Sequence, residues 1–516
     1  MISLPTMALH NEPGVAWRPM LWLAAGIVVA HVIVNATSPY GFHRDEFLYF
    51  AMGRHLRLFA MDFPPFIAMA AQVARAFGDS LVVIRLLPAL AAAGIVVITA
   101  LIVHELHGGR FAQVLACIAV LVSPLFLRAG NLFQPVVFDQ LWWTLALYAL
   151  ARIANRKGAV PSDWLLLGAA CGLGLLTKFI ILVLWGSVFV ALLLTPLRRS
   201  LRTRWPWLAL LLALVIGAPS ISGQIRLGLP VMSQMSDLQS SQLARVDGAD
   251  FMLGQVMMFG PAFLLALTGA VCLLGHRSFA PQRALGWACV IGFAAILVLR
   301  GKPYYAGPVY PALFAAGAAA LEGMTRAAFY RAASLGLIVL YGVITLPIGL
   351  PILPPGPMAR YATALGLTAA TTTNTGVVLE LPQDYADMLG WEQQVAAVAR
   401  VFATLTPPER EQAVLMASNY GEAGALDFFG PKYGLPPAVA PLGSYWFFGP
   451  GKKSGLVVIS VGSPPEDLQV FFRSVSLVAT VNEPWVVPEE RDVPIVIARD
   501  PYRPLQAVWP QFKGRN

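Results

Sequence analysis

Long apolar segments separated by short polar ones fill the first two thirds of this 516-residue chain. A helix needs about 20 apolar residues to cross a bilayer. The pattern predicts about eleven such helices, at residues 18–37, 81–103, 111–128, 135–152, 162–177, 179–197, 206–226, 251–275, 283–300, 304–322 and 332–351. The sequence therefore predicts a polytopic α-helical membrane protein.

The pattern changes after residue 351. A Pro- and Gly-rich stretch begins a predicted linker over 352–374. Beyond it, alternating and helical spacings predict strands at 413–417, 456–461, 475–481 and 495–498, and helices at 391–403 and 421–429. A membrane module over 1–351 is thus expected to precede a small α/β domain over 375–516.

Composition supports the membrane assignment and limits the partners. The chain is 57% hydrophobic and 12% charged, whereas soluble proteins carry about 25% charged residues. The net charge of +9 is uneven, because the basic excess lies in the first 350 residues and acids outnumber bases after them. That excess suits membrane loops and anionic lipids. No basic domain stands apart, so nucleic acid is not an expected partner. The four cysteines lie in apolar stretches, as core residues do.

Basic residues cluster in alternate loops, which predicts the orientation. They are Arg110, Arg152, Arg156, Lys157, Arg198, Arg199, Arg202, Arg204, Arg277, Arg283, Arg326 and Arg331. The positive-inside rule then puts the N-terminus in the cytoplasm, with a retained first helix, and the C-terminal domain outside. Residues 38–80 become the first outer loop. Its stretches 47–59 and 66–77 predict short helices along the membrane interface.

Carboxylates are scarce in the membrane part, and several gather in that first outer loop. The loop contains His43-Arg44-Asp45-Glu46 and, soon after, Asp62-Phe63-Pro64-Pro65. Charge at a membrane boundary is costly and marks functional candidates. An acid here could serve as a base, although Asp45 and Glu46 also suit a helix-capping pair and Asp62 suits a helix start. Asp139 could face the same cavity or act as a helix N-cap.

Cations at the same boundary could hold an anionic group. Lys178 lies between two apolar segments, and Arg300 and Lys302 precede Tyr304 and Tyr305. Arg300 and Lys302 could also extend to lipid head groups. His43, His55 and Asp62 leave room for a divalent metal, but their spacing matches no recognised ligand pattern. No cofactor is indicated with certainty, and the chain lacks a Gly-rich phosphate loop and a nucleophile elbow.

Taken together, these residues resemble bacterial glycosyltransferase family 39. These are membrane enzymes of the GT-C fold, related to protein O-mannosyltransferases and the lipid A aminoarabinose transferase. The resemblance rests on Arg44-Asp45-Glu46 with Tyr49, Asp62-Phe63-Pro64-Pro65, Asp139, Leu176-Thr177-Lys178, and Arg300-Gly301-Lys302-Pro303-Tyr304-Tyr305. It departs at one point, since the lipid A aminoarabinose transferase has Glu-Lys where this chain has Asp62-Phe63.

The resemblance implies sugar transfer from a polyprenyl-phosphate donor to an envelope acceptor at the outer face of a bacterial inner membrane. Asp45 and Glu46 would be catalytic. Lys178, Arg300, Lys302, Tyr304 and Tyr305 would bind the donor phosphate, and Asp62, Asp139, Arg44 and Tyr49 would position the acceptor. Two alternatives remain at this point. One is a transporter or flippase of polyprenyl lipids or glycans, and the other is a non-catalytic glycan-sensing membrane protein.

Overall fold

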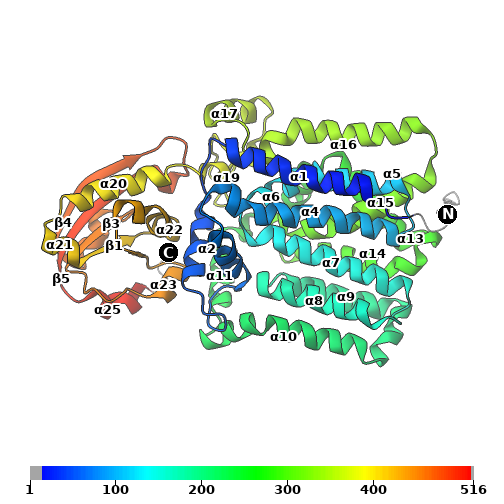
Figure 1. Cartoon of the computed structure of the whole chain (residues 1–516), viewed down its shortest axis with the longest axis horizontal. Helices are drawn as coiled ribbons and strands as arrows, with labels where there is room; N and C mark the ends of the chain where they lie inside the picture. The colour runs from blue at the N-terminus through cyan, green and yellow to red at the C-terminus, as the bar shows by residue number, and fades with distance from the viewer. Residues whose placement is uncertain (1–13, 513–516) are drawn as a thin grey trace.

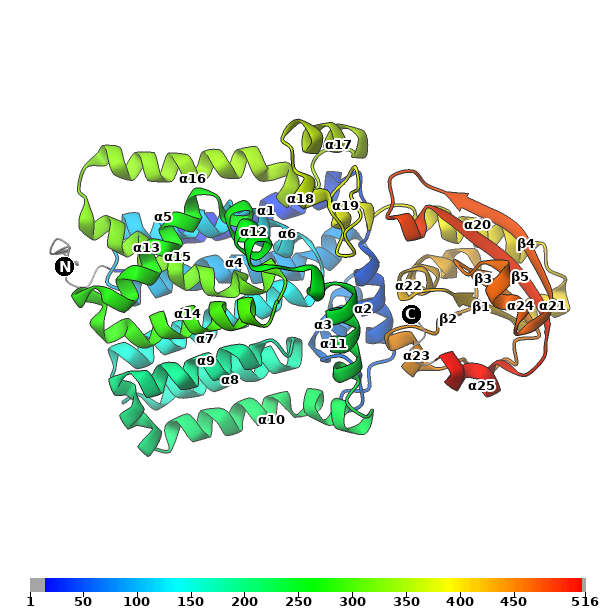
Figure 2. The same cartoon turned by 180° about the vertical axis from the view of Figure 1, so that it is seen from behind.

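The protein has two parts stacked along its long axis, a bundle of roughly parallel helices and a domain built on a β-sheet (Figure 1). The computed structural model describes residues 14–512. Viewed from behind, the same helices run the length of the bundle, and the C-terminal domain covers only one of its ends (Figure 2). This end is called the capped end below, and the other the open end.

Helices occupy every range that hydropathy predicts as a span. They are α1 (Trp17–Thr37), α4 (Leu81–Glu105), α5 (Arg110–Leu121), α6 (Pro124–Asn131), α7 (Pro135–Asn155), α8 (Pro161–Thr177), α9 (Ile181–Leu194), α10 (Trp205–Arg226), α12 (Gly248–Phe259), α13 (Pro261–Gly275), α14 (Arg283–Val298), α15 (Tyr310–Met324) and α16 (Ala328–Gly349). The fold is a multi-pass membrane bundle, as predicted.

The number of spans depends on how bent helices are counted. Within residues 14–512, five helices are long and apolar enough to cross a membrane, or up to eight if each bent pair forms one span. One such pair, α12 and α13, bends by 109°. The prediction for 304–322 is wrong at its start, because residues Pro303–Val309 form a 3₁₀ segment and α15 begins at Tyr310. Pro308 lacks the N–H that an earlier α-helical start would use.

Short elements cross the capped end between the bundle and the C-terminal domain. In the first loop these are α2 (Arg44–Arg54) and α3 (Phe66–Ala76), as expected for 47–59 and 66–77. Further short helices are α11 (Pro230–Ser241), α17 (Pro355–Ala364), α18 (Thr368–Thr371) and α19 (Gln383–Ala386). Met358 of α17 is buried with Tyr40 and Tyr385, so part of the segment predicted as a linker is packed. The division into domains remains a prediction.

The C-terminal domain is a five-stranded mixed sheet in the order β2-β1-β3-β5-β4. Its strands are β1 (Ala413–Ala417), β2 (Ala438–Val439), β3 (Val457–Val461), β4 (Phe472–Asn482) and β5 (Asp492–Pro501). Strand β1 is parallel to both neighbours, whereas β5 is antiparallel to β3 and β4. Four strands confirm the sequence prediction. The two-residue strand β2 is too short for periodicity to reveal.

Helices cover both faces of this sheet. Leu415 and Ile459 face α20 (Trp391–Ala403) and α22 (Tyr420–Phe429) in the main core, while Val414 and Val458 face a smaller core. Alternate residues of each strand therefore serve different cores, as the twofold period of a strand requires. The remaining short helices are α21 (Pro407–Gln412), α23 (Ser444–Phe448), α24 (Pro465–Gln469) and α25 (Leu505–Val508).

A buried ion pair anchors α2 to the bundle. Glu46 and Arg85 of α4 have fully buried side chains, and their atoms Oε2 and Nη2 are 2.7 Å apart. Glu46 Oε1 also accepts the backbone N–H of Phe133 at 2.8 Å. Its Oε2 accepts the N–H of His43 at 2.7 Å, which caps the start of α2. Burial alone would raise the pKa of Glu46, but Arg85 and the backbone N–H groups of Phe133 and His43 together outweigh burial and lower it.

These bonds correct the expectation that Glu46 shares in chemistry with Asp45. Both of its oxygens are occupied by donors, and the side chain does not reach solvent. Glu46 therefore holds α2 in place, in line with the capping alternative.

Helix α22 packs unusually closely on α2. A Cβ atom added to Gly424 would lie 2.6 Å from the Cβ of Phe47 and 2.9 Å from its carbonyl carbon. Real side chains do not approach this closely, so only glycine fits there. The C-terminal domain is thus seated directly on the first loop.

Removing the anchor of α2 should strongly destabilise the protein. Arg85→Met leaves the Glu46 carboxylate buried without its partner, which costs about 3–5 kcal/mol. Thermal unfolding in detergent would show this loss as a lower midpoint. Asp79→Asn is the matched control, since Asp79 pairs with Arg75 in the same loop but is 52% exposed. It should cost less than about 1 kcal/mol. Equal, small losses for both variants would contradict the anchoring role.

The close contact of α2 and α22 can be tested with a single methyl group. Gly424→Ala should lower the unfolding midpoint, because overpacking of this kind costs about 1–3 kcal/mol. Gly336→Ala in α16 is the control, since its added Cβ would meet nothing within 4 Å and alanine favours a helix. A Gly424→Ala variant as stable as the wild type would show that the two helices do not pack this tightly.

Candidate functional site

Asp45 lies in the first turn of α2, where the helix dipole favours a negative charge. Its side chain is 29% exposed, so one part faces solvent while the rest is held. Gln134 Nε2, just before α7, donates to Asp45 Oδ2 at 3.1 Å. The Tyr420 hydroxyl of the C-terminal domain donates to Asp45 Oδ1 at 2.9 Å. The bundle and the C-terminal domain therefore each hold one oxygen of this carboxylate.

Further carboxylates lie beside Asp45. Asp384 and Asp387, both from the α19 segment, place an oxygen 3.8 Å from His43 Nε2. His43 Nδ1 accepts the backbone N–H of Asp45 at 3.1 Å. Arg44 Nη1 lies 3.6 Å from Asp387 Oδ1. These five residues, His43, Arg44, Asp45, Asp384 and Asp387, are called the carboxylate cluster.

The two acids from α19 differ in their electrostatics. Burial would raise the pKa of Asp384, but Arg128, which donates to it at 2.7 Å, and His43 together outweigh burial and hold the pKa far below its ordinary value. Burial raises the pKa of Asp387 to about 6, although His43 and Arg44 oppose the rise. The pKa of neighbouring Tyr49 is also raised by burial and further by the charge of Asp45. Asp384 is therefore firmly ionised, whereas Asp387 holds its proton more readily.

A second group lies near the ends of the bundle helices. Lys178 is the C-cap of α8, and its Nζ lies 4.5 Å from the centre of the Tyr305 ring and 5.3 Å from that of Tyr304. Lys302 lies in the turn just before these tyrosines, and its Nζ donates to Asn374 Oδ1 at 3.1 Å. Lys178, Lys302, Tyr304 and Tyr305 are called the cation–tyrosine cluster. The structure brings together these four of the five residues predicted to bind phosphate.

Lys302 of the cation–tyrosine cluster senses the charges of the carboxylate cluster. Burial lowers the pKa of Lys302, and the nearby charge of Lys178 lowers it further, while Asp384 and Asp45 act in the opposite direction. Lys302 therefore lies within electrostatic reach of both Asp45 and Lys178. Acidic and cationic side chains thus meet in one region between the bundle and the C-terminal domain.

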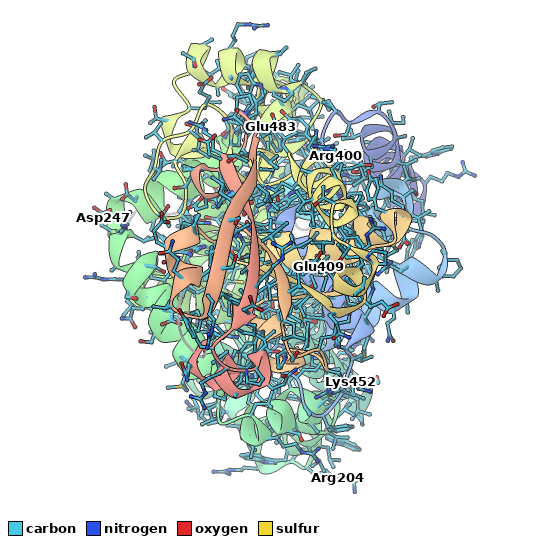
Figure 3. All side chains as sticks on the ribbon, turned by 90° about the vertical axis from the view of Figure 1, so that its left-hand side faces the viewer. Arg204, Asp247, Arg400, Glu409, Lys452 and Glu483 are labelled. Atoms are coloured by element: carbon cyan, nitrogen blue, oxygen red, sulfur yellow. The ribbon has the colours of Figure 1, made fainter. Side chains whose placement is uncertain are left out.

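Arg300, the fifth predicted phosphate ligand, lies elsewhere. It is exposed and lines a separate pocket of about 240 Å³ with Asp247, Gly248 and Phe251. Figure 3 looks along the long axis onto the C-terminal domain, and Asp247 lies on the flank of the bundle beside that domain. The prediction that Arg300 joins Lys178 and Lys302 is therefore corrected, because the turn before Pro303 directs it to another surface.

Asp62 and Asp139 also differ from expectation. Asp62 is buried, and its Oδ2 accepts the hydroxyl of Ser444 at 2.8 Å, so it fastens α23 of the C-terminal domain instead of lining a cavity with Asp45. Asp139 is not an N-cap, since α7 begins at Pro135 with Gln134 before it. It is buried within electrostatic reach of Lys178.

The weak metal candidates do not converge. His55 stacks on Phe448 at 4.2 Å between ring centres, Asp62 binds Ser444, and His43 lies between Asp384 and Asp387. Over residues 14–512, no three His, Cys, Asp or Glu side chains are grouped so that they could hold a metal ion. His43, His55 and Asp62 therefore do not form one metal site.

Sequence reasoning missed Gln134, Asp384, Asp387 and Tyr420. Asp384 and Asp387 come after the membrane part of the chain. Acidic residues are common in that later region, so these two do not stand out in the sequence. Tyr420 directly precedes the helix predicted over 421–429, but nothing local indicates that it meets Asp45, 375 positions earlier. A Tyr directly after an N-cap Asn, beside small residues that permit close packing, is the one signal available.

Comparison with known proteins supports the fold. Residues 62–222 match the family model described as dolichyl-phosphate-mannose-protein mannosyltransferase. No protein of curated function matches the sequence significantly.

Similar solved structures cover nearly the whole chain. ArnT from Cupriavidus metallidurans bound to undecaprenyl phosphate is 17% identical, with 93% of this chain and 98% of that chain covered and a TM-score of 0.61. The apo form of the same protein is 16% identical, with 94% and 98% covered and a TM-score of 0.60. Arabinofuranosyltransferase AftD from Mycobacteria is 14% identical, with 95% and 42% covered and a TM-score of 0.51.

These matches confirm the resemblance drawn from the sequence. The family match begins at Asp62, inside the first loop, and ends within α10. The structural matches extend the likeness to the C-terminal domain. The chain therefore has the GT-C fold of membrane glycosyltransferases, and its residues 62–222 are similar to the dolichyl-phosphate-mannose-protein mannosyltransferase family model.

Proposed function

We propose that this protein is a membrane glycosyltransferase that moves a hexosyl or pentosyl group from a polyprenyl-phosphate donor to an acceptor of the cell envelope. One observation carries the proposal, namely that Lys302 lies within electrostatic reach of both Asp45 and Lys178. The reaction needs both a base for the acceptor and cations for the departing phosphate. A similar fold, that of ArnT, binds undecaprenyl phosphate.

The cation–tyrosine cluster suits the donor phosphate. Two ammonium groups, those of Lys178 and Lys302, lie within electrostatic reach of each other, and among the described contacts neither is bonded directly to a carboxylate. Their mutual repulsion makes an anion favourable between them. Lys178 follows a membrane helix, so a lipid phosphate could reach it from the bilayer while the polyprenyl chain stays among the helices.

Asp45 suits the acceptor. In the proposed step, the acceptor oxygen bonds to the anomeric carbon of the sugar while the bond from that carbon to the phosphate oxygen breaks. The acceptor proton passes to Asp45, and the departing phosphate keeps the electron pair near Lys178 and Lys302. Hydrogen bonds from Gln134 and Tyr420 fix the carboxylate, which leaves its exposed edge toward the acceptor.

The basic loops support an orientation for this chemistry. The loops that follow α4, α7, α9, α13 and α15 lie at the open end of the bundle, away from the C-terminal domain (Figure 1). They contain most of the basic residues predicted to be cytoplasmic. The site would then face the outer side of a bacterial inner membrane, where envelope acceptors are found.

The proposal predicts which variants lose turnover. Release of polyprenyl phosphate would be measured in lipid vesicles, with a panel of polyprenyl-phosphate sugars and cell-envelope extract as acceptor. Asp45→Asn should lower turnover by about 10²–10⁴-fold, the usual contribution of a general base. Lys302→Met should weaken donor use by about 10–100-fold, because a hydrogen bond to a charged group is lost.

Arg300→Met is the control, since this substitution removes the same charge as Lys302→Met, but from a separate pocket. It should keep most of the wild-type turnover. Equal losses in Arg300→Met and Lys302→Met would contradict the assignment of the phosphate site. Binding of a donor without any release by the wild type would favour the transporter or the glycan sensor.

A further inference from the structure

Tyr420 joins the C-terminal domain to the first loop at the candidate site. It is the first residue of α22 in the C-terminal domain, and its hydroxyl donates to Asp45 Oδ1 at 2.9 Å. The Tyr420 ring also lies 5.1 Å from the guanidinium carbon of Arg44, the neighbour of Asp45. The tyrosine thus contacts two consecutive residues of the first loop.

The position of Tyr420 is fixed from within the C-terminal domain. Asn419 caps α22, because its Oδ1 accepts the N–H groups of Gly421 and Glu422 at 2.8 and 3.1 Å. Its Nδ2 donates to Glu490 Oε1 at 2.9 Å, and Gln394 Nε2 donates to Glu490 Oε2 at 3.0 Å. Buried polar groups bonded in this way allow few alternative arrangements. The start of α22 is therefore held before it meets the first loop.

The topology of the sheet explains why this point faces the site. Strand β1 lies between β2 and β3, and all three are parallel. After β1 the chain forms β2 on one side of β1 and then β3 on the other side. The carboxyl end of β1 is therefore a topological switch point. Open α/β sheets bind ligands at such points. Here the switch point carries Asn419 and Tyr420, and α2 lies against it.

Small residues make the contact short enough. A side chain at Gly424 would collide with Phe47 of α2, and a Cβ atom at Gly421 would lie 2.9 Å from Trp391 and 3.3 Å from the Cβ of Arg44. This close approach lets a tyrosine hydroxyl span from α22 to Asp45. A looser interface would leave Asp45 with Gln134 alone as a donor.

We propose that Tyr420 is a positioning residue for Asp45, so that the C-terminal domain completes the active site instead of serving as a separate binding module. The inference rests on the proposed function, in which Asp45 acts on the acceptor. Tyr420 acts through Asp45 and does not touch the cation–tyrosine cluster in any described contact. Its removal should therefore lower the rate of transfer without weakening the binding of the donor.

A double-mutant cycle tests this in the full-length protein in lipid vesicles. Tyr420→Phe, Asp45→Asn and the double variant would be compared with the wild type, both for turnover and for the midpoint of thermal unfolding. Tyr445→Phe is the matched control, because the buried Tyr445 hydroxyl also donates to an aspartate, Asp427 Oδ2, at 2.9 Å. It removes the same kind of bond within the same domain, away from Asp45.

We expect Tyr420→Phe to lower kcat by about 10–100-fold, the usual effect of losing a hydrogen bond to a charged group, with the donor KM unchanged. In the Asp45→Asn background the same change should have little further effect, since coupled residues are not additive. Tyr445→Phe should keep the wild-type kcat. Equal kcat values for Tyr420→Phe and Tyr445→Phe would overturn the positioning role, and so would full additivity with Asp45→Asn.

The unfolding measurements separate this inference from the proposed function. Coupling between Tyr420 and Asp45 in the unfolding midpoints would support the contact even if no donor is turned over. In that case the transferase proposal fails, while the contact between Tyr420 of the C-terminal domain and Asp45 of the first loop stands. Additive midpoints would show that Tyr420 does not hold Asp45, whatever the turnover.

Discussion

The buried ion pair between Glu46 and Arg85 is the constraint on which the site depends. It joins the first turn of α2 to the bundle helix α4. A buried carboxylate that lost this partner would be left uncompensated, so α2 has one favourable position. His43, Arg44 and Asp45 begin the same helix and are placed with it. Glu46, which the sequence suggested as a catalytic acid, thus holds its neighbour Asp45 in place.

The candidate site is assembled from three regions with different tasks. The bundle supplies cations near helix ends, where Lys178 and Lys302 lie beside two tyrosines. The first loop supplies Asp45, and the segment around α19 adds Asp384 and Asp387. The C-terminal domain supplies Tyr420. Opposite charges are kept apart by these separate supports, so the acids do not simply neutralise the lysines. A site built in this way can hold an anionic group and a base at the same time.

Several features could be predicted because they are local. Long apolar runs predicted the bundle helices, and short apolar runs at 413–417 and 495–498 predicted the strands β1 and β5. The short helices of the first loop were also recognised. The boundary of α15 was missed because prolines delay an α-helix without changing the hydropathy of the run. Arg300 and Lys302 looked equivalent in sequence, yet a turn of two residues sends them to different surfaces.

The sequence by itself determined the membrane class, the two-part order of the chain and the residue types available for chemistry. These properties follow from composition and short-range periodicity, which act over a few turns of helix or a single strand. Only the tertiary structure decided that Glu46 is an anchor, that Asp62 fastens the C-terminal domain, and that Tyr420 meets Asp45. Each of these depends on a hydrogen bond between distant segments, and its partner is fixed by how helices and sheet pack, which no local pattern records.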